Sequence, residues 1–402
     1  MNPPLILDLS RLLWRSGRQV PTGIDRVELE YAKHFIASAG DRLDFVASTL
    51  TGHTRFLPQR LTRRFVLALD RVWQGDNDGP GAARTARRLA MMLRLSLPFG
   101  GRRRRAAAEP PIYLHVSHHH LDRPKVIERF KAWTGARILC LVHDLIPIDW
   151  PEYVRPGHDR RHTARIETVA RYADGIILNS AATGRSLQPF LDRAGRQIPA
   201  VVAPLGVPDT RTGPRAEASE PPYFITIGTI EPRKNHLLLL TVWRDIAAEL
   251  GANAPHLVVI GQRGWENENV VDLLERSPSI RRTVREYNSL PDAEMTRLLT
   301  GARALLMPSF AEGYGLPIAE ALAAGVPVIC TPLPPFKEVG GDVPDYRDAI
   351  DGLGWRAAII DYAAEDSFLR PAQLARLAHW QRPTWADHFA QVAQVIETLG
   401  AP

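Results

Sequence analysis

The chain has 402 residues, more than one ordinary hydrophobic core accommodates, which indicates about two domains with a cleft between them. Hydrophobic residues make up 45% and charged residues 23%, which excludes a disordered or fibrous protein. Fifty Lys and Arg against 44 Asp and Glu give a net charge of +6, which suits an anionic substrate, an anionic membrane face or nucleic acid.

Three features predict where the protein resides. Cys140 and Cys330 are the only cysteines and stand inside apolar runs, as buried thiols of a reducing compartment do. The first ten residues, MNPPLILDLS, lack a basic region and are better read as a first strand than as a signal peptide. No run approaches the ~18 apolar residues of a membrane-spanning helix, so we expect a cytoplasmic protein.

The first half of the chain alternates short apolar runs with amphipathic stretches. This alternation predicts a parallel sheet flanked by helices. The expected strands are LILDL (5–9), DFVAST (44–49), IYLHVS (112–117), RILCLVHD (137–144), GIILNS (175–180) and AVVAPLG (200–206).

The second half repeats this pattern after a segment rich in Pro, Gly and charge. Its expected strands are YFITIGT (223–229), HLVVIG (256–261), ARALLMPS (302–309) and VPVICT (326–331). We therefore predict an α/β protein with two Rossmann-like, doubly wound domains. The expected bounds are 1–208 for the first domain, 209–222 for the linker, 223–382 for the second domain, and 383–402 for a helix that packs back on the first.

The stretch from Ser309 to Cys330, SFAEGYGLPIAEALAAGVPVIC, carries the strongest chemical signal. An apolar strand leads into a Gly-rich turn with Glu312, and Glu320 follows on the next helix. Ligands of open α/β sheets bind at such strand ends, and the unpaired N–H groups of the helix attract a phosphate. Carboxylates there accept hydrogen bonds from sugar and ribose hydroxyls. The alternative is an ordinary turn residue and a pairing within the helix.

A second stretch, TIGTIEPRKNHLLLL (226–240), places two cations at the end of another strand. Arg233 and Lys234 begin the next helical segment. Adjacent cations at that position are suited to neutralise a diphosphate, and Arg binds such groups bidentately. Surface ion pairing is the alternative for each cation taken alone.

Together these stretches resemble the retaining family-4 glycosyltransferases of the GT-B fold. The resemblance covers most of residues 220–395, through GTIEPRKN (228–235), GQRGW (261–265), LPDAEM (290–295), PSFAEGYGLPIAEALA (308–323) and PTWADHFAQV (383–392). It implies a nucleotide-diphosphate sugar as donor, with Arg233 and Lys234 on the diphosphate, Glu312 on the sugar hydroxyls and Glu320 on the ribose. It also implies donor contacts from Gly313, Tyr314, Gly315 and Leu316.

The first half resembles this family less strictly. In VPTGIDRVELEYAKHF (20–35), Thr22 and Asp25 have the spacing of a capping box, and Gly23 lets backbone N–H groups approach a phosphate. Many relatives have two glycines at this loop, whereas this chain has one. VHDLIPIDWPEY (142–153) resembles the segment in which His143 would face the transferred sugar and take part in catalysis.

Several other features stay open. Asp76-Asn77-Asp78 matches a D-x-D metal motif but lies in a Gly/Pro-rich stretch, so a solvated turn is favoured. His118, His119 and His120 are consecutive and cannot converge on one ion from a strand, which leaves an acceptor-lining loop or plain surface. Residues 51–110 carry no readable motif, and Arg102–Arg105 form a basic run that suits either a solvated loop or an anionic membrane surface.

The resemblance predicts a metal-independent hexosyltransferase of surface polysaccharide or lipopolysaccharide synthesis that needs no cofactor. Mannose from GDP-mannose is favoured as donor, with UDP- and dTDP-sugars left open, and the acceptor would be a glycan or a polyprenyl-linked glycan. The alternatives are a phosphorylase-type enzyme of the same fold and a non-catalytic nucleotide-sugar-binding subunit. Nucleic-acid binding is disfavoured because no basic and aromatic readout module is present.

Overall fold

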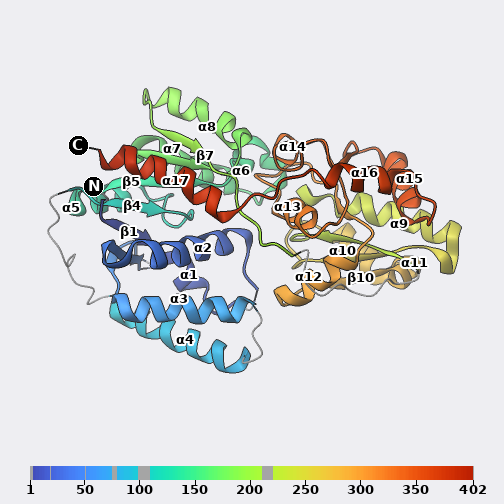
Figure 1. The fold of residues 1–402 in the computed structure, drawn as a ribbon, viewed down its shortest axis with the longest axis horizontal. Coiled ribbons are helices and arrows are strands. Elements are labelled where there is room, and N and C mark those ends of the chain that lie inside the picture. The colour runs from blue at the N-terminus through green and yellow to red at the C-terminus, as the bar shows by residue number, and fades with distance from the viewer. Residues whose placement is uncertain are drawn as a thin grey trace. The chain divides into compact units, whose positions relative to one another are not determined.

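The computed structural model describes residues 3–18, 20–49, 51–74, 79–97, 109–210 and 221–401. Its contacts divide the chain into two compact units (Figure 1). The first unit comprises Met1–Asp149, Gly157–Leu205 and Ala386–Pro402, and the second comprises Trp150–Pro156 and Gly206–Trp385. The sequence-based bounds did not single out Trp150–Pro156. Residues 211–220 of the proposed linker lie outside the described residues.

The first unit is built on a seven-stranded sheet of described residues, with the order β3-β2-β1-β4-β5-β6-β7. All neighbouring pairs are parallel except β2 and β3, which are antiparallel. The strands are β1 (Leu5–Asp8), β2 (Leu43–Ser48), β3 (Thr54–Phe56), β4 (Ile112–His115), β5 (Arg137–Val142), β6 (Gly175–Leu178) and β7 (Ala200–Val202). Six of them lie in the apolar runs of the sequence, because a parallel strand covered on both faces is apolar throughout.

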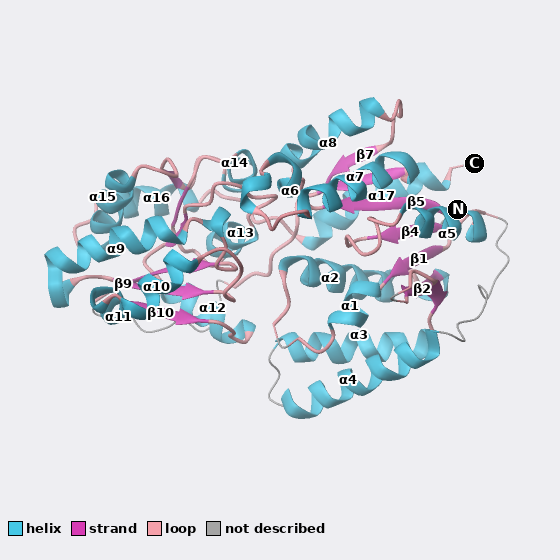
Figure 2. Ribbon diagram, turned by 180° about the vertical axis from the view of Figure 1, so that it is seen from behind, coloured by secondary structure: helices cyan, strands magenta, loops and turns pink. Residues whose placement is uncertain are grey.

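Helices flank these strands (Figure 2). They are α1 (Ser10–Arg15), α2 (Gly23–Ser38), α3 (Gln59–Gln74), α4 (Gly79–Ser96), α5 (Pro124–Thr134), α6 (Ile146–Asp149), α7 (His158–Tyr172) and α8 (Ala181–Arg193). Helices α3 and α4 pack against each other as a hairpin between β3 and β4. No motif in residues 51–110 had indicated this hairpin, although the spacing of Arg84, Arg87, Arg88 and Arg94 is that of a helix face.

The final helix, α17 (Trp385–Gly400), packs on the first unit. Nε2 of its buried His388 is hydrogen-bonded to the hydroxyl of Tyr31 on α2, at 2.7 Å. Its Leu399 and Val395 lie so close to β6 that a Cβ on Gly175 would approach each within 2.9 Å. The C-terminal segment is therefore part of the core of the first unit.

The second unit has a six-stranded, wholly parallel sheet of described residues in the order β10-β9-β8-β11-β12-β13. Its strands are β8 (Tyr223–Ile227), β9 (His256–Ile260), β10 (Val284–Tyr287), β11 (Leu305–Met307), β12 (Val328–Cys330) and β13 (Asp345–Tyr346). Strand β8 lies centrally beside β11, so the loops after these two strands meet at one edge of the sheet. The two informative stretches of the sequence are these loops.

The helices of the second unit are shorter on average than those of the first. They are α9 (His236–Leu250), α10 (Glu268–Arg276), α11 (Pro278–Thr283), α12 (Asp292–Gly301), α13 (Leu316–Ala323), α14 (Pro334–Gly340), α15 (Gly352–Ala363) and α16 (Leu369–Leu377). A 3-10 turn, η4 (Pro232–Lys234), precedes α9.

Both cysteines are buried free thiols, as the sequence predicts. Burial raises the pKa of Cys140 to about 12 and raises that of Cys330 well above its usual range. Among the described residues, no helix has both the length and the apolar character needed to cross a bilayer.

Candidate donor-binding site

The loop after β8 places Arg233 and Lys234 at the carboxyl edge of the second sheet. Gly228 has a positive φ of 149°, and a Cβ there would lie 3.1 Å from Cε of Lys234. Glycine is therefore required where the chain turns beneath the lysine stem. The cations follow in η4, whose first residue, Pro232, has the fixed φ that suits the start of a helical turn.

Glu312 stands in the loop after β11 and binds both cations. Its Oε2 lies 2.7 Å from Nη1 of Arg233, and its Oε1 accepts from Nζ of Lys234. Ser309 also donates to Oε1, at 2.9 Å. The backbone N–H of Phe310 donates to the carbonyl of Arg233 at 2.8 Å, which joins the two loops through the main chain as well.

Two further residues hold this cluster, and neither was predicted from the sequence. Glu231 is 4% exposed and lies 2.6 Å from Nη2 of Arg233. Asn235 adopts a left-handed conformation with φ of 56° and donates from Nδ2 to the carbonyls of Pro308, at 3.2 Å, and Ala349, at 2.8 Å. Both stand inside the GTIEPRKN stretch, so the motif itself was the available signal.

Burial and charge together set the protonation of the cluster. Burial alone would raise the pKa of Glu312, but Arg233 and Lys234 outweigh it and lower this pKa to about 2. Burial lowers the pKa of Lys234, and burial raises the pKa of Glu231. Glu312 is therefore a carboxylate at neutral pH, able to accept hydrogen bonds but not to donate a proton.

The remaining donor-binding candidates of this unit surround the start of α13. Gly315 has a φ of 108°, and a Cβ there would lie 2.9 Å from Phe336, so only glycine fits before Leu316. Tyr314 is buried, whereas Gly313 and Glu320 are half-buried. Pro317 has no N–H, and the N–H groups of Ile318 and Ala319 donate to the carbonyl of Gly315, so an anion at this end would meet the N–H of Leu316 and the positive end of the helix dipole. Arg233, Lys234, Glu312 and the turn at 313–315 thus belong to two adjoining loops.

His143 and Gly23 belong to the first unit. His143 follows β5 and is buried, with Nε2 2.7 Å from the carbonyl oxygen of Val116. Burial lowers its pKa, so the neutral ring donates from Nε2 and presents Nδ1 as an acceptor. Its carbonyl accepts from Nδ2 of Asn179 at 2.8 Å, which fixes the strand end.

Gly23 opens α2, and the capping box predicted from Thr22 and Asp25 is present. Asp25 accepts from the backbone N–H of Thr22 at 2.8 Å and is fully buried. Arg11 and Arg15 of α1 lie 2.6 Å and 3.0 Å from this carboxylate. Burial opposes the ionised form, yet the two arginines and the Thr22 hydrogen bonds lower the pKa of Asp25. The single-glycine loop is thus held by two ion pairs.

The three consecutive histidines are not plain surface. His118 packs edge-on against His143 and His162, with ring centroids 5.3 Å and 5.2 Å apart. Nε2 of His118 and of His119 is buried without a hydrogen-bond partner, whereas His120 contacts the carbonyl of Thr49 at 3.1 Å. Among the described residues, no group of His, Cys, Asp or Glu has an arrangement that could hold a metal ion. Asp76-Asn77-Asp78 lies outside those residues.

The segment quoted as VHDLIPIDWPEY divides between the two units. His143 belongs to the first, whereas Tyr153 stacks on Phe310 of the second unit with ring centroids 5.3 Å apart. Arg155 lies over the ring of Trp265 at 5.3 Å. The apolar and aromatic residues of this segment gave no signal of which domain they would join.

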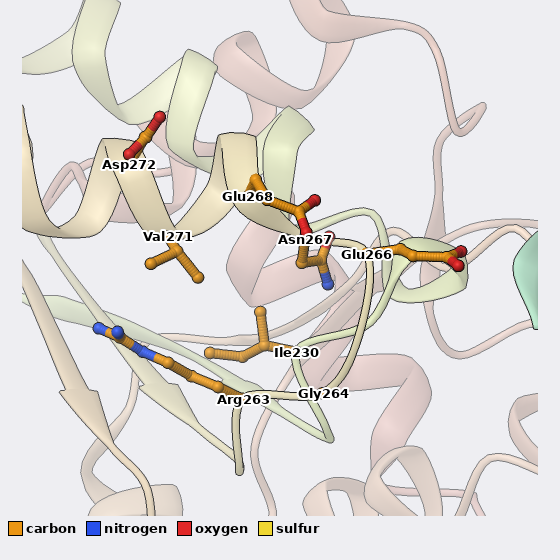
Figure 3. A pocket seen from close by; sticks show the side chains of 8 residues that line it. All are labelled: Ile230, Arg263, Gly264, Glu266, Asn267, Glu268, Val271 and Asp272. Carbon is orange, nitrogen blue, oxygen red and sulfur yellow. The ribbon is translucent and has the colours of Figure 1, made fainter. Parts of the chain in front are cut away.

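A separate cavity of about 240 Å³ lies beside the GQRGW stretch (Figure 3). Arg263 and Ile230 line one side and Val271 of α10 lines the other. Arg263 lies 2.8 Å from Glu286 and also pairs with Glu275, so its charge is balanced locally. None of the site residues expected from the sequence lines this cavity.

Comparisons with known proteins agree with the geometry. Residues 211–343 match the family model described as "Glycosyl transferases group 1". The serotype-specific mannosyltransferase WbdA of Escherichia coli is 28% identical over 235 residues, covering 54% of this chain and 29% of that protein. O-antigen chain mannosyltransferase B of E. coli is 34% identical over 177 residues, covering 44% and 46%. The matches thus span less than half the length of these relatives.

Among solved structures, the sucrose-phosphate synthase of Thermosynechococcus elongatus aligns over 99% of both chains with a TM-score of 0.64 and 14% identity. At this identity the likeness establishes the fold alone. The predicted GT-B fold is confirmed, and residues 211–343 are similar to the glycosyl transferases group 1 family.

Proposed function

We propose that the protein is a retaining glycosyltransferase that moves a sugar, with mannose preferred, from a nucleotide diphosphate to a glycan or polyprenyl-linked glycan in surface polysaccharide synthesis. The observation that carries this proposal is the Arg233–Glu312–Lys234 cluster beside the start of α13. Two cations at one strand edge, with the positive end of the α13 dipole beside them, fit a diphosphate better than any neutral ligand.

Glu312 serves as an acceptor for sugar hydroxyls in this proposal. A carboxylate has about four acceptor positions, and Lys234, Ser309 and Arg233 take three of them. We assign the remaining position, on Oε2, to a hydroxyl of the donor sugar. Because the group stays ionised, it orients the sugar and stabilises positive charge that develops at the anomeric carbon, rather than protonating a leaving group.

The leaving group is a nucleotide diphosphate, on which negative charge grows as the glycosidic bond breaks. Arg233, Lys234 and the N-terminus of α13 supply positive potential without a metal ion, so we propose metal-independent transfer. Retention requires that the acceptor attack from the face that the diphosphate leaves. We therefore assign no protein general base, and Glu320 and His143 act as binding groups for ribose and sugar.

The relatives' names support the preference for mannose, since the two curated proteins above are mannosyltransferases. The acceptor follows less directly, from the O-antigen chain in one of those names. The basic run Arg102–Arg105, which we propose as a contact with an anionic membrane, lies outside the described residues.

The test is turnover of GDP-mannose with methyl α-mannoside and with mannose disaccharides, followed by NMR of the product. We expect GDP release that depends on the acceptor, and an α-linked product. A β-linked product would contradict retention. Formation of mannose 1-phosphate from a glycan and inorganic phosphate would favour the phosphorylase alternative, and donor binding without turnover would favour the non-catalytic one.

A further inference from the structure

The segment that contains the α3–α4 hairpin accounts for the net positive charge of the chain. Residues 51–108 contain thirteen arginines and three aspartates, with no lysine and no glutamate. Since the complete chain has a net charge of +6, the remaining residues are net negative. From Gly79 to Ala108 there is no acidic residue at all. Charge so confined to one segment indicates an electrostatic surface rather than a general solubility device.

The exposed face of α4 is cationic at one end and apolar at the other. Arg84, Arg87 and Arg88 are exposed in its first half. Met91 is 56% exposed and Leu95 is 66% exposed, and Met92 beside them is 44% exposed. Residues 84, 88, 91 and 95 recur at helical spacing, so they lie along one stripe that faces away from the buried Leu89 and Leu93.

Helix α3 repeats this arrangement. Arg60, Arg64, Leu67 and Arg71 follow one another at helical spacing, and all four are exposed. Leu67 is 54% exposed and stands between the arginines. Two neighbouring helices thus each present a large apolar side chain among cations.

Other arginines of the hairpin are engaged in holding it in place. Arg63 donates to the carbonyls of Ile36 and Gly40, and Arg94 donates to the carbonyl of Leu13 and lies over the ring of Trp14 at 5.0 Å. The exposed arginines of the hairpin are Arg60, Arg64, Arg71, Arg84, Arg87 and Arg88. With the described residues, none of these six forms an ion pair or a side-chain hydrogen bond. They are not needed to fasten the hairpin.

A binding partner of this surface must match both its exposed arginines and its exposed apolar side chains. A second copy of the same face would bring like charges together, and a nucleic acid would leave Met91 and Leu95 in water. An anionic lipid bilayer attracts the arginines to its headgroups and receives the apolar side chains at the acyl boundary. We propose that the α3–α4 hairpin docks on an anionic membrane surface, with Met91 and Leu95 inserted and the arginines on the headgroups.

This surface lies within the described residues, and its function is independent of sugar transfer. It deepens the membrane contact proposed above for Arg102–Arg105 by assigning it to described residues, and binding to lipid can be measured without donor or acceptor. A negative result for sugar transfer would leave the docking surface unaffected. A negative result for vesicle binding would likewise leave the donor site unaffected.

The charge part is tested by co-sedimentation of the full chain with sucrose-loaded vesicles of phosphatidylcholine and phosphatidylglycerol at 3:1. We expect binding at 0.1 M NaCl that falls at 0.5 M and is absent on pure phosphatidylcholine. Each arginine removed should weaken binding about fivefold. R84Q/R87Q/R88Q should therefore lose most of it, whereas R276Q/R281Q/R282Q, which removes equal charge from exposed residues of the second unit, should retain it. Equal losses in the two triple variants would overturn the proposal.

The apolar part is tested by attaching an environment-sensitive fluorophore to Met91→Cys, since Cys140 and Cys330 are buried and stay unlabelled. Adding the anionic vesicles should shift its emission to the blue. The same label on Leu353→Cys, where the native leucine is 82% exposed in the second unit, should not respond. No shift at position 91, or unchanged vesicle binding by M91S/L95S, would contradict insertion. Thermal melting of each variant verifies that the fold is kept.

Discussion

Nη1 of Arg233 lies 2.7 Å from Oε2 of Glu312, although the two residues are 79 positions apart in the chain. They meet because β8 and β11 are neighbours in the second sheet, so the loops at their carboxyl ends converge. Lys234 binds the other oxygen of the same carboxylate. One ionised side chain therefore aligns both cations before any donor arrives, and the energetic cost of orienting them falls on folding rather than on binding.

Replacing Glu312 by Gln should impair both stability and transfer. The amide keeps the shape but removes the anion of Lys234 and leaves Arg233 with Glu231 alone, which costs about 3 kcal/mol of the free energy of unfolding. We expect kcat to fall about a hundredfold or more, as when one preorganised electrostatic group is removed. Urea unfolding and GDP-mannose turnover at a temperature where the variant is folded would measure these effects.

The matched control is Glu365→Gln, which removes the same charge from an exposed position of the second unit. It should leave turnover and the urea midpoint within experimental error of the wild type. A Glu312→Gln enzyme with wild-type kcat would remove Glu312 from the proposed mechanism.

The pH dependence of stability should reveal the same cluster. Arg233 and Lys234 overcome the effect of burial and hold the pKa of Glu312 at about 2, below the ordinary 4.5 of the unfolded chain. This stabilisation is complete above about pH 4.5 and is lost as pH falls toward 2, because the unfolded state then binds the proton first. The shift corresponds to about 3 kcal/mol. The difference in unfolding free energy between wild type and Glu312→Gln should shrink between pH 5 and pH 3. A difference that stayed constant over this range would contradict the lowered pKa of Glu312.

His236 offers an opposite test, because it destabilises the fold. Both of its ring nitrogens are buried without a hydrogen-bond partner, in the apolar surroundings of Leu239 and Val259. Burial lowers its pKa to about 3, so only the unfolded chain takes up a proton as pH falls below about 6.5. His236→Leu should raise the unfolding free energy by about 1–3 kcal/mol at pH 7.

The gain from His236→Leu should grow by about 1.4 kcal/mol for each unit that pH falls below 6.5. Urea titrations at pH 7, 6 and 5 measure it. A gain that stayed level or shrank toward pH 5 would show that the buried ring accepts a proton in the folded state. His256→Leu is a less buried control in the same unit, since its side chain is only half-buried.

Gly261 lies directly against the main chain of Gly228. An added Cβ would lie 1.9 Å from the carbonyl oxygen of Gly228, so Gly261→Ala must displace the loop that carries Arg233 and Lys234. We expect a loss of about 2–4 kcal/mol in stability together with weaker donor binding. Gly17→Ala, where a Cβ would meet nothing within 4 Å, should be neutral. Similar melting temperatures for both variants would contradict the close approach.

The sequence predicted the parallel strands well because their signal is local. Ten apolar runs each contain a strand of the sheets, since residues buried on both faces leave an uninterrupted apolar stretch. Three strands were not predicted: β3 (Thr54–Phe56), β10 (Val284–Tyr287) and β13 (Asp345–Tyr346). Each contains charged residues, so no apolar run marks it. The arginine spacing from Arg84 to Arg94 indicated a helix face, but the pairing of α3 with α4 was not predicted, because their outer faces bear arginines and apolar side chains together and obscure the helical pattern.

In the site, residues marked by a local sequence pattern were predicted, and residues defined by tertiary contacts were not. Arg233, Lys234 and Glu312 were identifiable because each follows an apolar strand, and strand order brings them together. Glu231 and Asn235 were missed because their partners, Arg233 and the carbonyls of Pro308 and Ala349, are tertiary contacts. The partial burial of His118 and His119 depends on α7 packing against the end of β4, which the residues alone do not reveal.

The most direct test of the donor site is calorimetric binding of GDP-mannose, UDP-glucose and dTDP-rhamnose to the full chain, with and without EDTA. We expect GDP-mannose to bind most tightly, with no effect of EDTA and a tenfold or greater loss of affinity in Arg233→Gln. Arg276→Gln, an exposed control in the same unit, should bind as the wild type does. If no nucleotide sugar bound, or if the two variants behaved alike, the assignment of this cluster as a donor site would be contradicted.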